Sequence, residues 1–164
     1  MRTWIRSIQQ KIKAVLQVCC FVLFGFTASV TIAVAQTLVA NNATAVSTGG
    51  LHSCAVINGG VQCWGNNSQA QLGDIRPPNY NGPNINVVPV QTIPAGSGVT
   101  MVSAGASHSC AVVNSGVQCW GENSYGQLGN NSTTQSRIHV QAIAVGSNVT
   151  AVSAGTGHSC AVVN

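Results

Sequence analysis

One stretch of sequence occurs twice in this chain and begins a third time. The first copy, residues 45–73, reads AVSTGGLHSCAVINGGVQCWGNNSQAQLG, and the second, residues 101–129, reads MVSAGASHSCAVVNSGVQCWGENSYGQLG. A third copy begins at Ala151 and reads AVSAGTGHSCAVVN. The same histidine recurs in each copy, at His52, His108 and His158. Repetition at a period of about 50 residues indicates an array of similar supersecondary units that pack against one another.

Each unit contains the signature of a β-hairpin. In the first copy, two β-rich runs flank Asn58-Gly59, and Asn-Gly between apolar runs is typical of a type I′ turn, which needs positive φ at both central residues. This turn would place Cys54 opposite Cys63 in a non-hydrogen-bonded pair, where side chains approach most closely. Such a pair has the separation that a disulfide needs. We therefore predict a Cys54–Cys63 bond.

The second copy repeats this hairpin with less favourable turn residues. Its turn reads Asn114-Ser115-Gly116, and we expect a less regular turn there that carries a bulge. The same register predicts a disulfide between Cys110 and Cys119. Cys160 occupies the first cysteine position of the third copy, whose partner would lie nine residues further on. A framework of this kind is typical of proteins that fold in an oxidising compartment.

A metal site is the alternative interpretation of these cysteines. His52, Cys54 and Cys63 could together offer three ligands. Closed zinc sites take four ligands, however, and the hairpin already pairs the two sulfurs. We therefore expect no metal and no other cofactor.

The combined pattern GxxHSCAVxNxGVQCWGxNxxGQLG resembles the repeat of the regulator of chromosome condensation family, whose members form seven-bladed β-propellers. The resemblance covers residues 42–164, and the form with cysteines is similar to that of exported bacterial members. It implies an all-β fold built of propeller blades. Repeat 1 would span about residues 42–97, repeat 2 about 98–147, and residues 148–164 would start repeat 3, so that the chain is the amino-terminal part of a propeller.

One position departs from the pattern of the repeat. Ala70 stands where the second copy has Gly126. If this site requires positive φ, the first blade is strained there, because a side chain disfavours that conformation.

Residues 1–35 differ in kind from the repeats. Four of the six basic residues lie within residues 2–13, and an apolar run follows from Ala14 to Ala35. The run ends in Ala33-Val34-Ala35, a small-x-small cleavage pattern, so the sequence predicts a signal peptide, a helical segment at 1–35, and a mature chain at 36–164. A retained membrane anchor is the alternative, because the run is long enough to span a bilayer. We therefore expect a secreted or cell-surface protein.

Loss of this segment would leave very few charged residues. Those that remain are Asp74, Arg76, Glu122 and Arg137. Without a stripe of Lys and Arg, the chain lacks the electrostatic footprint of a nucleic-acid-binding protein. The two carboxylates stand at different positions of the repeat, and neither a nucleophile elbow nor a phosphate-binding glycine loop occurs. These observations favour a protein that is not an enzyme and does not bind nucleic acid.

Residues that recur in every copy are expected to serve the packing that every blade shares. We expect buried imidazoles bonded to the backbone at the repeated histidines His52, His108 and His158. Blade-to-blade packing is expected for Trp64 and Trp120.

Residues that bind a partner are expected at positions where the copies differ. The clearest difference is a loop at 74–83, rich in Pro, Asn and Gly, which carries Arg76 and Tyr80. Tyr125 replaces Gln69 of the first copy, and Tyr and Arg are among the residue types that dominate interface energetics. Arg76, Tyr80 and Tyr125 are therefore the candidate binding residues.

These features predict a non-catalytic, exported propeller that presents loops to a protein or a cell-surface ligand. Propellers of the resembling family include a nucleotide-exchange factor for a small GTPase and a secreted bacterial inhibitor of β-lactamase, and the resemblance implies roles of this kind. One alternative is the amino-terminal part of a larger surface enzyme. Another is a regulator similar to the exchange factor, which the signal peptide disfavours. Membrane contact is expected only if residues 1–35 are retained as an anchor.

Overall fold

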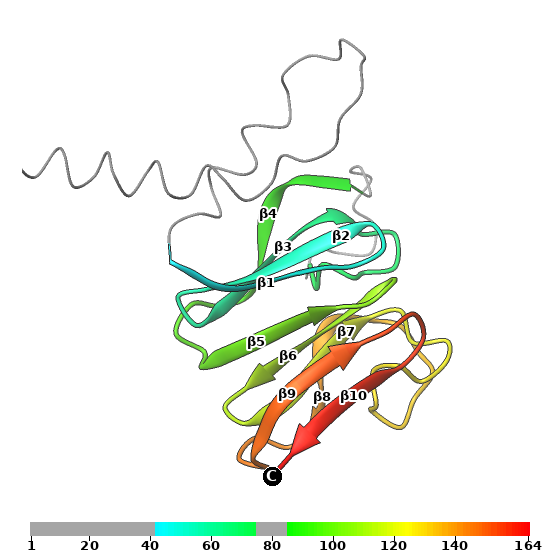
Figure 1. Cartoon of the computed structure of the whole chain (residues 1–164). Helices are drawn as coiled ribbons and strands as arrows, with labels where there is room; N and C mark the ends of the chain where they lie inside the picture. Colours follow the sequence, from blue (N-terminus) through cyan, green and yellow to red (C-terminus); the bar gives the residue numbers. More distant parts are fainter. Residues whose placement is uncertain (1–41, 75–84) are drawn as a thin grey trace, which may run out of the picture. The chain divides into compact units, whose positions relative to one another are not determined.

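The structure, a computed structural model, describes residues 42–74 and 85–164, and all regular elements of this part are β-strands (Figure 1). The strands are β1 (Ala43–Thr48), β2 (His52–Ile57), β3 (Gly60–Asn66), β4 (Ile85–Ile93), β5 (Val99–Ala104), β6 (His108–Val113), β7 (Gly116–Gly121), β8 (Ser136–Ile143), β9 (Val149–Ala154) and β10 (Ser159–Val163). The predicted all-β class is thereby confirmed. Residues 1–35, with the expected signal helix, lie outside the described residues.

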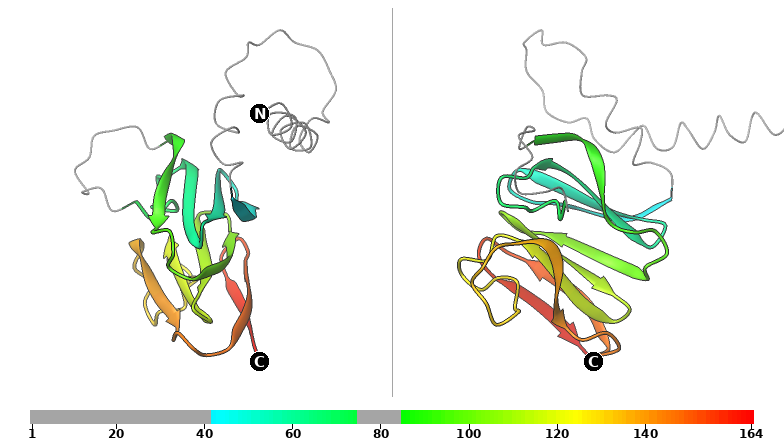
Figure 2. Two further views of the ribbon diagram at one scale, coloured as in Figure 1. Left: turned by 90° about the vertical axis from the view of Figure 1, so that its left-hand side faces the viewer. Right: turned by 180° about the vertical axis from the view of Figure 1, so that it is seen from behind.

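The strands form three antiparallel sheets, each built from consecutive strands. The first sheet has the order β1-β2-β3-β4, the second β5-β6-β7-β8, and the third consists of β9 and β10. Figures 1 and 2 show the sheets stacked in chain order, with β1 packed against β5 and β5 against β9. Face-to-face stacking of four-stranded meanders is the arrangement of propeller blades. We call the sheets blades one, two and three. No helix of the described residues is long and apolar enough to cross a membrane.

The first hairpin has the predicted register. Ile57 pairs with Gly60, and Cys54 lies opposite Cys63. Asn58 and Gly59 have φ of 51° and 69°, as a type I′ turn requires. Both disulfides form, Cys54–Cys63 with 4.1 Å and Cys110–Cys119 with 4.0 Å between Cα atoms.

The expected bulge in the second hairpin is absent, and that prediction was wrong. Val113 pairs directly with Gly116, while Asn114 and Ser115 take φ of 47° and 60°. The linker to the next blade imposes this shape, because the Gly146 amide donates to the Asn114 carbonyl at 2.9 Å and the Val149 amide to the Ser115 carbonyl at 3.0 Å. Two hydrogen bonds thus offset the cost of positive φ at a serine.

The apolar core lies between the blades, because alternate residues of a strand face opposite neighbours. Strand β6 is buried throughout. Its Ala111 and Val113 join the cluster between blades one and two, whereas Cys110 and Val112 join the cluster between blades two and three. A middle blade is therefore apolar on both faces, and its inner strands show no polar alternation.

The turn after the third strand contains the predicted strain. Ala70 has φ of 60° and is fully buried, and Gly126 occupies the same place in blade two with φ of 75°. A Cβ atom at Gly126 would meet no other atom within 4 Å. An alanine at Gly126 would therefore carry the cost of positive φ without an added steric clash.

We expect Gly126→Ala to destabilise the protein by about 1–2 kcal/mol, the usual cost of a left-handed L-residue. Urea unfolding measures this difference. The matched variant Ala70→Gly should lose less stability or gain some, because relief of the backbone strain offsets the loss of the buried methyl group. Equal losses in both variants would contradict the interpretation of Ala70 as strained.

Candidate functional site

The interface between blades one and two brings together a disulfide from one blade and an indole from the next. The Cys54–Cys63 disulfide and Trp120 belong to one buried cluster, although they come from different blades. Within β7, Cys119 and Trp120 are neighbours in sequence and therefore point to opposite faces of the sheet. The Cys-Trp pair of the repeat thus serves two interfaces at once.

The carbonyl of Gln71 receives two hydrogen bonds from blade two. The indole Nε1 of Trp120 donates to it at 2.9 Å, and the Ser109 hydroxyl donates to it at 3.0 Å. Trp120 is fully buried, as blade-to-blade packing requires. Trp64, the corresponding residue of blade one, is half-buried.

The repeated histidines bridge successive blades through a serine hydroxyl. Nε2 of His52 lies 2.8 Å from Oγ of Ser109, and Nε2 of His108 lies 2.9 Å from Oγ of Ser159. For His52 the partner is thus a side chain of the next blade, where we expected backbone. Because the single Ser109 proton goes to the Gln71 carbonyl, Nε2 of His52 must donate, and the ring is the neutral Nε2–H tautomer.

Burial makes the charged form of His52 unfavourable. Nδ1 is buried and has no hydrogen-bond partner among the described residues. A Cβ atom on Gly49 would lie 2.8 Å from this nitrogen, so only glycine fits there. A proton on Nδ1 would find no acceptor in this enclosed place, and burial, with a smaller contribution from His108, lowers the pKa of His52 to about 4.

His108 repeats this environment one blade later. Burial lowers its pKa, and the neighbouring His158 acts in the same direction through its charge. Gly105 packs against His108 as Gly49 packs against His52. His158 is exposed at blade three.

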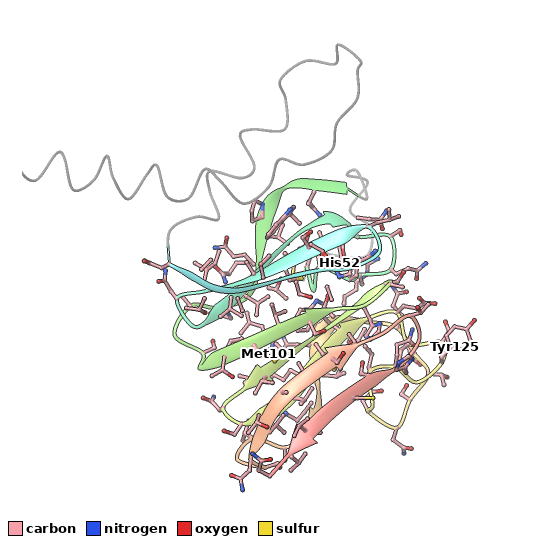
Figure 3. All side chains as sticks on the ribbon, viewed as in Figure 1. His52, Met101 and Tyr125 are labelled. Atoms are coloured by element: carbon pink, nitrogen blue, oxygen red, sulfur yellow. A yellow bond between two sulfur atoms is a disulfide. The ribbon has the colours of Figure 1, made fainter. Side chains whose placement is uncertain are left out.

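The repeated Gln-Leu-Gly turns follow the third strand of each four-stranded blade, and we call the surface at these turns the rim. The turn of blade two orients the candidate interface residue Tyr125. Oε1 of Gln127 accepts the Tyr125 amide at 2.9 Å, and Oδ1 of Asn123 accepts the Leu128 amide at 2.9 Å. The Asn123 amide group also donates to the Ser132 carbonyl at 2.8 Å, which ties the turn to the following loop. The Tyr125 side chain is 79% exposed and projects outward (Figure 3).

No contact was predicted for these asparagines and glutamines. Asn67 and Gln71 make the corresponding turn contacts in blade one, where they accept the Leu72 and Gln69 amides. Their recurrence at fixed spacing before Leu72 and Leu128 was the available signal. It did not reveal which backbone groups they bind.

The other candidate residues are placed only in part. Arg76 and Tyr80 lie outside the described residues, so the structure does not bring them together with Tyr125. In the described part of the chain, no three His, Cys, Asp or Glu side chains gather as a metal site. Cys54 and Cys63, two of the three ligands considered, are joined to each other.

We expect stability to fall as the pH decreases from 6.5 toward 4. Below pH 6.5 the unfolded chain binds a proton at His52, whereas the folded chain binds this proton only near pH 4. The free energy of unfolding should therefore fall by about 3 kcal/mol across this window. Urea unfolding at several pH values measures the slope. His52→Gln keeps a neutral donor and does not titrate, so its profile should be flatter. An unchanged profile in this variant would contradict the assignment.

Trp120→Ala should lower the free energy of unfolding by about 3–5 kcal/mol, because it leaves a buried cavity and removes the hydrogen bond to the Gln71 carbonyl. Trp64→Ala serves as the matched control and should cost less, since Trp64 is half-buried. Thermal and urea unfolding of both variants test this order. A larger loss at Trp64 would contradict it.

Comparisons with known proteins agree with this architecture. The profile described as "Regulator of chromosome condensation (RCC1) repeat" matches residues 58–112 and 116–162, and a second profile of the same description matches residues 99–127. A search of curated proteins found no match.

Solved structures share the fold. Human WBSCR16 is 21% identical with a TM-score of 0.63, covering 76% of this chain and 31% of that one. Prp20p from Saccharomyces cerevisiae, whose crystal structure was described with its binding properties to Gsp1p and histones, is 18% identical with a TM-score of 0.62, covering 73% and 30%. Yeast RCC1 (Prp20) in the crystal structure with Kap60 is 16% identical with a TM-score of 0.60, covering 74% and 30%. This chain thus spans about a third of the length of the structures it matches.

The repeat profile covers more than half of the sequence, and the blades, their disulfides and their hairpin register repeat with it. The chain belongs to the regulator of chromosome condensation (RCC1) repeat family.

Proposed function

We propose that this chain is part of an exported, non-catalytic propeller that binds a protein or cell-surface ligand through its rim loops. The observation that carries the proposal is the placement of Tyr125. This large side chain is 79% exposed, yet its backbone is fixed by Gln127 and Asn123 through the adjoining turn. A rigidly held, exposed aromatic residue suits an interface, because little conformational freedom is lost on binding.

The disulfides support export. All four bonded cysteines are at most 1% exposed, and each bond lies in a blade-to-blade core. Reduction would leave thiols in these cores and free the hairpins, so the fold suits an oxidising compartment. The apolar segment before Gln36 supports the same location, with residues 1–35 as signal peptide and residues 36–164 as the propeller part.

The family supports a binding role. Prp20p was described with its binding properties to Gsp1p and histones, and yeast RCC1 (Prp20) in complex with Kap60. A binding role of the same general kind, with another partner, is proposed for this chain. The scarcity of Lys and Arg after residue 35 argues against phosphate backbones as the ligand.

Within this proposal, Arg76, Tyr80 and Tyr125 form the contact residues. We expect Tyr125→Gln to weaken partner binding by about 1–3 kcal/mol, the range of interface hot spots. Because the Tyr125 side chain is exposed, the melting temperature of this variant should stay nearly unchanged. Gln is the residue of blade one at this place, so the turn is preserved. Tyr80→Ala should have a similar effect on affinity.

The partner is first identified by placing a photo-crosslinking amino acid at position 125 in the exported protein. Titration calorimetry then measures the affinity of each variant, with Ser124→Ala as a control at the neighbouring exposed position. Unchanged affinity in both tyrosine variants would remove the rim from the interface. Amino-terminal sequencing of exported protein tests the location separately, with Gln36 expected as the first residue.

A further inference from the structure

The turn of blade two lacks one side-chain hydrogen bond that the turn of blade one makes. In blade one, Nε2 of Gln71 donates to Oδ1 of Asn66 at 2.9 Å. In blade two, the corresponding amide belongs to Gln127, which is 3% exposed, and its Nε2 has no hydrogen-bond partner among the described residues. Glu122 stands at the position of Asn66. The carboxylate therefore does not take over the hydrogen bond that the asparagine makes.

The contacts of Asn66 show where the Glu122 side chain begins. Oδ1 of Asn66 also accepts the Ser68 amide at 2.9 Å and the Ser68 hydroxyl at 2.7 Å. Ser68 adjoins Gln69, the counterpart of Tyr125. The side chain at this position of the repeat thus lies beside the main chain at the tip of the turn. Glu122 is half-buried and longer than asparagine, so its carboxylate extends from this place toward the solvent next to Tyr125.

The ring of Tyr125 rests against a glycine of blade three. A Cβ atom on Gly157 would lie 3.3 Å from Cδ2 and 3.7 Å from Cγ of Tyr125. The first and second copies have Leu51 and Ser107 at the position of Gly157, and side chains of these kinds would press on the ring. Because Tyr125 is nevertheless 79% exposed, the remainder of the ring faces the solvent (Figure 3).

The exposure belongs to this position of the repeat. Gln69 is exposed as well, although a complete four-stranded blade lies next to blade one. Asn66 and Glu122 are half-buried alike. Blade two thus presents an aromatic ring and a carboxylate on one turn, where blade one has two neutral amide side chains.

We propose that Tyr125 and Glu122 bind a cationic side chain, lysine or arginine, on the partner of the rim. This inference rests on the proposed function of the rim and gives the chemistry of its partner. A cation is attracted to the face of an aromatic ring, and a carboxylate supplies the opposite charge. The unpartnered amide of Gln127 supports the proposal, because a contact given up in a well-formed turn is expected where a residue serves function. The expected ligand is a basic segment of a protein.

Short peptides test this chemistry before the partner is identified. The whole chain is titrated with acetyl-Gly-Arg-Gly-amide and with the corresponding lysine peptide, and nuclear magnetic resonance follows the main-chain amides. The corresponding glutamine peptide is the neutral control. Both basic peptides should shift the resonances of Ser124 and Tyr125, and added salt should weaken their binding because the site is exposed. The glutamine peptide should leave these resonances unchanged.

Three variants separate the ring from the carboxylate. Tyr125→Leu removes the aromatic face, and Glu122→Gln removes the charge. Each should weaken binding of the arginine peptide about two- to fivefold, the effect of one exposed cation–π contact or ion pair. Glu122→Asn restores the residue of blade one, so it should weaken binding while raising the melting temperature, because Gln127 regains an acceptor. A merely structural role of Glu122 would not move these two measurements in opposite directions.

Equal shifts with the arginine and glutamine peptides would overturn the proposal, and so would unchanged binding in the two Glu122 variants. The partner crosslinked at position 125 gives an independent outcome. Contact through a segment without lysine or arginine would overturn the cation site and leave the rim as the interface. Binding of the basic peptides with no crosslinked partner would support the cation site and contradict the rim as a protein interface.

Discussion

The structure depends on the contact between one blade and the next. At this contact a disulfide, an indole and a histidine–serine hydrogen bond meet around the Gln71 backbone. A single four-stranded sheet with two apolar faces has no core of its own, so each blade is stable only when its faces are covered. The copies of the repeat therefore share the residues that form the contact, and they differ at positions that take no part in it.

The contact also explains why small and polar residues are fixed at particular places. Gly49 leaves room for the ring of His52, and a Cβ there would lie 2.3 Å from the Gly105 carbonyl oxygen. Ser109 both accepts from His52 and donates to the Gln71 carbonyl, so its one hydroxyl connects strand β2 with the turn after β3 in blade one. Burial of this network lowers the pKa of His52 and favours its neutral form, so acid is expected to weaken the interface. Stability, pH response and repeat sequence thus have the same origin.

The proposed binding role rests on parts of the chain that this contact leaves unconstrained. Tyr125 sits on a turn held by Gln127 and Asn123, so the fold orients an exposed ring without burying it.

The repeated sequence predicts the blades and the register of the first hairpin. Asn58-Gly59 sets the turn, and the turn places Cys54 opposite Cys63 by local geometry alone. The contacts between blades, in contrast, depend on how the sheets stack against one another. The partner of His52 is Ser109, 57 residues away, and the linker to blade three removes the expected bulge at Ser115. Hairpin register depends on neighbouring residues, whereas these contacts depend on the stacking of sheets that no local pattern specifies.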